Sequence, residues 1–223
     1  MRNKIFAVLV CFFIITFSFS QDSQSFYYEN EFEISIPLKN NWSIDFGAGN
    51  RGLLQEKLNG KSISGYQHEH LELNHFTKYK AKEFLAISLG LRYRFREIFD
   101  SFNRDEIRII EQIEIGSTNS SLPISHRFRL EQRFREETIH RVRYALQFSR
   151  PLIDEFSVGL ATEALFAFSR PSKPEAEQRF SLGFENTSFK DLKLGLDLEY
   201  RIENYTRTPG HEFFLITGVS FSL

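Results

Sequence analysis

The sequence has one cysteine, one methionine and no long apolar run after its first residues. Cys11 is the single cysteine and Met1 the single methionine. Because Cys11 lies in a stretch that we expect to be removed, the mature chain would offer no disulfide, no thiol nucleophile and no N-terminal cysteine to carry a lipid. Beyond that stretch, no segment approaches the ~18 consecutive apolar residues that a transmembrane helix needs. The sequence therefore excludes a helical membrane protein.

The chain also lacks a strong charge of either sign. Its formal net charge is -1 over 223 residues, which argues against nucleic-acid binding through a global basic field. Aromatic residues are abundant instead: they make up 15% of the chain, and 25 of them are phenylalanine. Many aromatic residues in a chain of mildly hydrophilic average are typical of strands that are apolar on only one side.

The first 20 residues have the pattern of a secretory signal peptide. Two basic residues precede an apolar run that ends near Phe19. Ser18 and Ser20 place small residues three and one positions before a cleavage site. We therefore predict that residues 1–20 are a cleaved signal peptide and that residues 21–223 form a single β-barrel domain.

From Phe26 to Leu223 the chain alternates apolar and polar side chains. Successive side chains of a strand point to opposite faces, so each alternating segment has one apolar and one polar face. Stretches rich in proline, glycine, asparagine and serine separate the segments. We expect strands at residues 26–36, 42–51, 64–76, 84–97, 104–115, 125–136, 139–149, 155–168, 178–187, 191–203 and 211–223.

This pattern predicts an all-β protein, an antiparallel up-and-down transmembrane β-barrel in a bacterial outer membrane. Eleven segments are counted, but single-chain bacterial barrels have even strand numbers. We therefore expect ten or twelve strands. Either one segment splits or fuses, or the strand at 26–36 is not a regular member of the barrel.

Alternation alone also fits a soluble barrel that binds an apolar ligand, because a lipocalin-like barrel is the same pattern turned inside out. Three features favour the membrane barrel: arginines and glycines recur on the polar faces, and the opposite faces are almost purely apolar. An arginine that faces lipid costs about 2–4 kcal/mol at the bilayer midplane. Several such arginines would remove much of the usual free energy of unfolding, which is about 5–15 kcal/mol. We therefore expect the arginines to point into the lumen.

We predict that the lumen holds a mixed cluster of charges rather than a bare basic ring. Pairing through residues 136–138 is expected to place Arg133 and Arg135 opposite Arg141 and Arg143. Like charges directly opposed are destabilising, so carboxylates should lie among them. The predicted cluster comprises Arg92, Arg94, Arg96, Arg127, Arg129, Arg133, Arg135, Arg141, Arg143, Glu114 and Glu131. The apolar residues predicted to face outward between these arginines are Phe128, Leu130, Phe134, Val142, Tyr144, Leu146 and Phe148.

Few residues suggest a chemical site. On a strand, His68, His70 and Glu72 would share a face, and two imidazoles with a carboxylate are weak candidates for a zinc site that would need further ligands. Serines and His75, His126, His140 and His211 are present, but no nucleophile elbow marks any of them. We predict no catalytic residue, no cofactor and no occupied metal site.

The last segment resembles the signal that the outer-membrane barrel insertion machinery recognises. Leu215, Thr217, Val219, Phe221 and Leu223 lie on one face of an amphipathic strand that runs to the C-terminus. That signal usually has an aromatic residue at the last position, where this chain has leucine. The expected partners are this machinery, outer-membrane lipid and lipopolysaccharide. The sequence leaves the oligomeric state open.

Two segments carry a resemblance to a known family. Residues 126–134 (HRFRLEQRF), which residues 140–144 (HRVRY) follow, resemble the central signature of the domain-of-unknown-function 2490 family. The segment at 42–44 (WSI), which begins the second strand after a Lys-Asn-Asn turn, resembles the start of that family. The resemblance implies an outer-membrane location and a barrel-like fold, and it implies no activity and no site residues.

Three functions remain as hypotheses. The first is a non-enzymatic outer-membrane barrel that is a structural envelope component or a narrow pore. The second is an outer-membrane enzyme that modifies lipid or lipopolysaccharide. The third is a secreted soluble barrel that binds an apolar ligand in its interior.

Overall fold

A computed structural model describes residues 23–58, 61–96, 105–117, 123–170 and 173–223. The predicted signal peptide lies outside these residues. Within the described ranges, no helix has the length and apolarity needed to cross a membrane.

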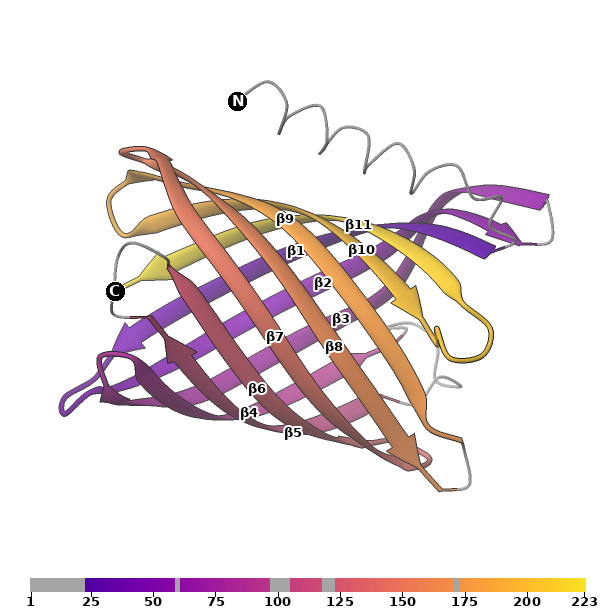
Figure 1. Cartoon of the computed structure of the whole chain (residues 1–223), viewed down its shortest axis with the longest axis horizontal. Helices are drawn as coiled ribbons and strands as arrows, with labels where there is room; N and C mark the ends of the chain where they lie inside the picture. The colour runs from indigo at the N-terminus through magenta and orange to yellow at the C-terminus, as the bar shows by residue number, and fades with distance from the viewer. Residues whose placement is uncertain (1–22, 59–60, 97–104, 118–122, 171–172) are drawn as a thin grey trace.

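The described residues form eleven strands that close into one barrel (Figure 1). The order around the barrel is β1-β11-β10-β9-β8-β7-β6-β5-β4-β3-β2. The strands are β1 (Ser23–Pro37), β2 (Trp42–Leu58), β3 (Lys61–Lys82), β4 (Leu85–Phe95), β5 (Glu106–Gly116), β6 (Ile124–Phe134), β7 (Thr138–Ile153), β8 (Phe156–Ser169), β9 (Glu175–Phe189), β10 (Leu192–Glu203) and β11 (Gly210–Ser222). The all-β barrel predicted from the alternation is confirmed, and each predicted segment corresponds to one strand.

The expectation of ten or twelve strands is wrong. The described chain has eleven strands, and β1 is a regular member that pairs with β2 on one edge and β11 on the other. In an up-and-down barrel with an odd number of strands, the first and last strands run in the same direction. The closing pair is therefore parallel, whereas every other neighbouring pair is antiparallel.

The parallel seam between β1 and β11 is continuous. Its register runs from Gln24 opposite His211 to Ser35 opposite Ser222. At its end, the backbone N–H of Leu223 donates to the carbonyl of Ser35 at 3.0 Å. Closure satisfies backbone groups that an open sheet would leave exposed at two edges.

The parallel closure places the two ends of the described chain at opposite ends of the barrel. The end where β1 begins is the N-terminal end here, and the end where β11 stops is the C-terminal end.

Several connections at the C-terminal end are tight. In the turn between β1 and β2, Asn40 and Asn41 have φ of 58° and 66°. The Trp42 N–H donates to the Lys39 carbonyl at 3.4 Å. These are the features of a type I′ turn, which asparagine accepts at lower cost than most residues.

The barrel is polar inside and apolar outside. In β5, burial alternates residue by residue: Glu106 and Arg108 are 1% and 2% exposed, whereas Ile107 and Ile109 between them are 44% and 36% exposed. Of the buried residues described, most are polar or charged, and few are apolar. The interior therefore does not fit the alternative of a soluble barrel that holds an apolar ligand.

The outward face of the β6–β7 hairpin has the predicted apolar side chains. Phe128, Leu130, Phe134, Val142 and Tyr144 are exposed. Leu146 and Phe148, which belong to the same predicted set, are half-buried. Exposed large apolar side chains occur on all eleven described strands, so they surround the barrel.

The parallel seam can be tested by disulfide cross-linking in a Cys11→Ser background. The pairs Gln24→Cys with His211→Cys and Ser35→Cys with Ser222→Cys should each oxidise to a disulfide. The members of each pair lie directly opposite on neighbouring strands. Neighbouring strands are about 4.7–4.9 Å apart, and a disulfide requires a Cα separation of about 4.4–6.8 Å. The matched control, Gln24→Cys with Ser222→Cys, should stay reduced. Non-reducing electrophoresis gives the readout, and cross-linking of the control pair alone would show an antiparallel closure.

Candidate functional site

The candidate site is a charged cavity inside the barrel. Its volume is about 880 Å³, and ionisable side chains supply much of its lining. Three glycines, Gly47 and Gly49 of β2 and Gly218 of β11, also line it. The cavity is of the size of a small-molecule site, which is typically about 300–1,000 Å³.

The charges of the cavity are segregated between two walls on opposite sides of the barrel. The arginine wall belongs to β4–β7 and consists of Arg92, Arg94, Arg108, Arg127, Arg129, Arg133, Arg141 and Arg143. No described carboxylate of these four strands lines the cavity. The carboxylate wall belongs to β1, β2 and β10 and consists of Glu29, Glu31, Glu33, Asp45, Asp197, Glu199 and Glu203. Two arginines of these strands, Arg51 and Arg201, also line the cavity on this side. The strand order places these walls on opposite sides, with β3 between them on one side and β8 and β9 on the other.

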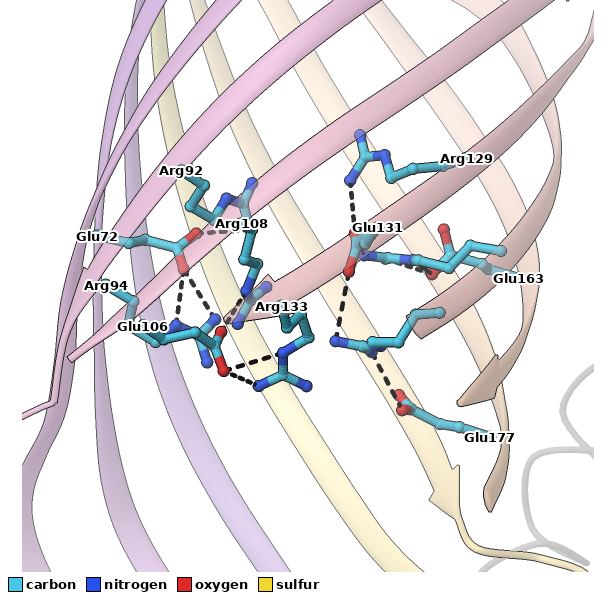
Figure 2. Close-up of polar contacts among 12 residues, drawn as sticks. Glu72, Arg92, Arg94, Glu106, Arg108, Arg129, Glu131, Arg133, Glu163 and Glu177 are labelled. Atoms are coloured by element: carbon cyan, nitrogen blue, oxygen red, sulfur yellow. Dashed lines mark hydrogen bonds and ion pairs between the residues drawn. The ribbon is translucent and has the colours of Figure 1, made fainter. Parts of the chain in front are cut away.

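Glu131 is one centre of an ion-pair network behind the arginine wall (Figure 2). Its side chain is fully buried, and its oxygens lie 2.7 Å from Arg143, 3.5 Å from Arg141 and 3.6 Å from Arg129. Glu163 of β8 extends the network: its carboxylate lies 2.5 Å from Arg143. Each of these carboxylates is therefore shared by several guanidinium groups.

Two further glutamates, Glu72 and Glu106, are the centres of separate ion-pair clusters (Figure 2). Glu72 of β3 accepts from Arg94 at 2.8 Å and pairs with Arg92 at 2.9 Å. Glu106 of β5 accepts two hydrogen bonds from Arg133, at 3.0 Å and 2.6 Å, and one from Arg108. Such forked contacts use the planar geometry of the guanidinium group, which lysine lacks.

The register of the β6–β7 hairpin differs from the prediction. Arg133 lies opposite Ile139, Arg141 opposite Glu131, and Arg143 opposite Arg129. The predicted opposition of Arg133 and Arg135 with Arg141 and Arg143 is therefore wrong. The reason is the loop: β6 ends at Phe134 and β7 begins at Thr138, so the chain turns earlier than expected. The shift is an even number of residues, and each side chain therefore keeps its face.

The remaining members of the predicted cluster lie toward its edges. Arg96 is exposed beyond the end of β4, and Arg135 is exposed beyond the end of β6, 3.9 Å from Glu106. Glu114 is opposite Arg127 in the β5–β6 register and accepts a hydrogen bond from Gln112 at 2.8 Å. The structure thus brings most of the predicted arginines to one wall and places these three residues at its margins.

Sequence reasoning left out Arg108 and Glu106, which are among the most buried residues described. The signal was present, because both share a face with Gln112 and Glu114. Two adjacent isoleucines, Ile109 and Ile110, obscure the alternation in this strand.

The carboxylate wall is only partly paired. Arg51 binds Glu29 at 2.9 Å, and Arg201 binds Glu199 at 2.5 Å. Both guanidinium groups lie over the buried Phe214 ring, at 4.8 Å and 3.6 Å from its centroid, an arrangement that adds cation–π attraction.

Four carboxylates of this wall have no such partner. Within the described residues, Glu31, Glu33, Asp197 and Glu203 form no hydrogen bond or ion pair. Glu31 and Glu33 are solvent-exposed although they line the cavity. The Asp197 carboxylate lies over Gly183, where any Cβ would collide with it.

The expected shared face of His68, His70 and Glu72 is interrupted. Arg51 of β2 is opposite His70, whereas the next residue of β2 is opposite His68, so Glu69 forms a bulge. His70 and Glu72 are buried, but His68 is exposed. The His70 ring instead lies 3.8 Å from the carboxylates of Glu69 and Glu72. Among the residues the structure describes, no three His, Cys, Asp or Glu side chains are grouped as metal ligands.

The other histidines are distributed over separate strands. His126 is 2.9 Å from the Tyr144 hydroxyl, and His211 is 2.7 Å from the Tyr200 hydroxyl. His140 stacks on Phe168 with ring centroids 5.5 Å apart. The structure does not bring these imidazoles together.

The family model described as protein of unknown function (DUF2490) matches residues 26–212. The chain belongs to the DUF2490 family. The resemblance based on residues 126–134, 140–144 and 42–44 is therefore confirmed. No curated protein shows a significant match.

One solved structure similar to this member of the family is described as a bacterial polysaccharide outer membrane secretin. Its sequence is 11% identical, the match covers 80% of this chain and 83% of that chain, and the TM-score is 0.49.

The importance of the network can be tested with Glu131→Gln. This change leaves three arginines around an uncharged amide, and removing one partner of a buried ion pair costs roughly 3–5 kcal/mol. We expect a clear fall in the urea midpoint of unfolding. The matched control is Glu185→Gln, because Glu185 forms an exposed pair with Lys193 at 3.0 Å, and such pairs contribute about 0–1 kcal/mol. Equal effects of the two changes would contradict the proposed importance of Glu131.

Proposed function

We propose that this protein is an outer-membrane β-barrel whose charged lumen forms a narrow pore for small solutes. The observation that carries the proposal is the inversion of polarity: charged side chains are buried inside the closed barrel, and large apolar side chains surround it. A bacterial membrane barrel requires this distribution.

The energetics of the outer face support a lipid environment. Full burial of a leucine or phenylalanine side chain stabilises the folded protein by about 1.5–3 kcal/mol. Each side chain that stays half-exposed in water therefore lacks roughly 1 kcal/mol of this stabilisation. More than thirty large apolar residues are exposed among those described. In water this loss would exceed the usual net stability of about 5–15 kcal/mol, whereas in lipid it disappears.

The size of the cavity in the lumen favours a narrow pore over a wide channel. The arginines and glutamates of the ion-pair clusters are buried inside the barrel, and the cavity that they leave is about 880 Å³. A barrel of this strand number is also narrower than the 16-stranded porins. We therefore propose passage of small polar solutes only.

The proposed location implies three partners. The apolar belt would contact outer-membrane lipid, and the loops would lie near lipopolysaccharide. The C-terminal strand, which pairs with both β10 and β1, would be the segment that the barrel insertion machinery recognises. No arrangement of described side chains favours the alternative of a lipid-modifying enzyme.

Fractionation and conductance test this proposal together. The protein should sediment with the outer membrane and should migrate faster on gels before boiling than after, as folded membrane barrels do. Refolded into planar bilayers, it should conduct KCl in small steps, well below those of a 16-stranded porin. Recovery in the soluble periplasmic fraction would contradict the membrane location. Correct insertion without conductance would leave a structural envelope protein as the function.

A further inference from the structure

Beyond a pore for small solutes in general, we propose that the lumen selects zwitterionic solutes, because its two charged walls create an electric field across the passage. The inference rests on the proposed function and specifies its substrate class. It concerns small molecules that carry both a cationic and an anionic group, such as amino acids.

The arginine wall carries an excess of positive charge. Its eight guanidinium groups share five buried glutamates, namely Glu72, Glu106, Glu131, Glu163 and Glu177. Two of these glutamates also bind Arg179 of β9. The pairs therefore neutralise only part of the wall, and the surplus is positive.

The carboxylate wall carries an excess of negative charge. Glu29, Asp45 and Glu199 have cationic partners, in Arg51, Lys78 and Arg201. The cavity-lining Glu31, Glu33, Asp197 and Glu203 form no ion pair within the described residues. This surplus of carboxylates faces the surplus of guanidinium groups across the same cavity.

The two walls face one cavity of about 880 Å³. Glu31, Glu33 and Asp197 line it on one side, and the eight arginines line it on the other. Low-dielectric walls concentrate the field of fixed charges in a cleft. A small zwitterion can present its carboxylate to the guanidinium groups and its ammonium to Glu31, Glu33 and Asp197. A solute of one charge sign gains from one wall and loses at the other.

Two isomeric solutes test the inference. β-Alanine is a zwitterion, and lactamide has the same atomic composition but no charges. In swelling assays with liposomes that contain the refolded protein, β-alanine should enter roughly threefold or more faster than lactamide. The ratio should fall as the salt concentration rises, because salt screens the fixed charges.

The triple variant Glu31→Gln, Glu33→Gln, Asp197→Asn removes three of the four unpaired carboxylates with almost no change in shape. It should reduce the ratio of the two rates to less than half of its value in the unaltered protein. The matched control is Glu83→Gln, Glu155→Gln, Asp191→Asn, which makes the same charge change at exposed turns of the C-terminal end. The control should keep the ratio of the unaltered protein. Gel migration before and after boiling verifies folding of each variant.

The outcomes separate the inference from the proposed function. Equal entry of both isomers through a conducting protein would overturn the zwitterion selectivity and leave the pore intact. An unchanged ratio in the triple variant would also overturn it, because the carboxylate wall would then have no role. Exclusion of both solutes and of KCl by an inserted barrel would overturn the pore and the selectivity together.

Discussion

Pairing between guanidinium groups and carboxylates is the interaction on which the interior of this barrel depends. Fully buried charges such as those of Arg108, Glu106 and Glu131 would each cost several kcal/mol if they were left alone. They are tolerated because each lies within an ion pair, and most lie in a shared network. The ion pairs join β3 to β4, β5 to β6, and β6 through β7 and β8 to β9, in addition to the backbone hydrogen bonds.

The same pairing explains the asymmetry of the lumen. On β4–β7 the arginines lie closely enough to share glutamates. On β1, β2 and β10, four carboxylates that line the cavity form no ion pair within the described residues. The arginine wall is therefore the more densely paired side of the lumen, and the proposed passage has unpaired carboxylates on its other side.

Alternation in the sequence predicts the strands and the face of most side chains, but not the details of pairing. The alternation of apolar and polar residues correctly predicts that Arg141 and Arg143 point inward. A register shift by an even number of residues does not change this direction. The residues opposite these arginines depend on where the chain turns after Phe134, which the sequence does not mark with glycine or proline. The bulge at Glu69 is likewise invisible in the pattern, and it separates His68 from His70. The eleven alternating segments gave the correct number of strands. The rule that bacterial barrels have even strand numbers led to the wrong expectation, because a parallel pair between the first and last strands closes a barrel of eleven.

A membrane barrel requires that the apolar face of each strand contacts lipid, and one substitution tests this contact directly. Leu130→Arg places a guanidinium in the middle of the outward face of β6, where lipid contact predicts a cost of about 2–4 kcal/mol. Leu152→Arg makes the same change close to the turn after β7, where the cost should be about 0–1 kcal/mol. Both leucines are exposed, at 49% and 59%. Unfolding in lipid vesicles should show a large loss of stability for Leu130→Arg alone. Little loss for either variant would mean that the outer face contacts water, which contradicts the account.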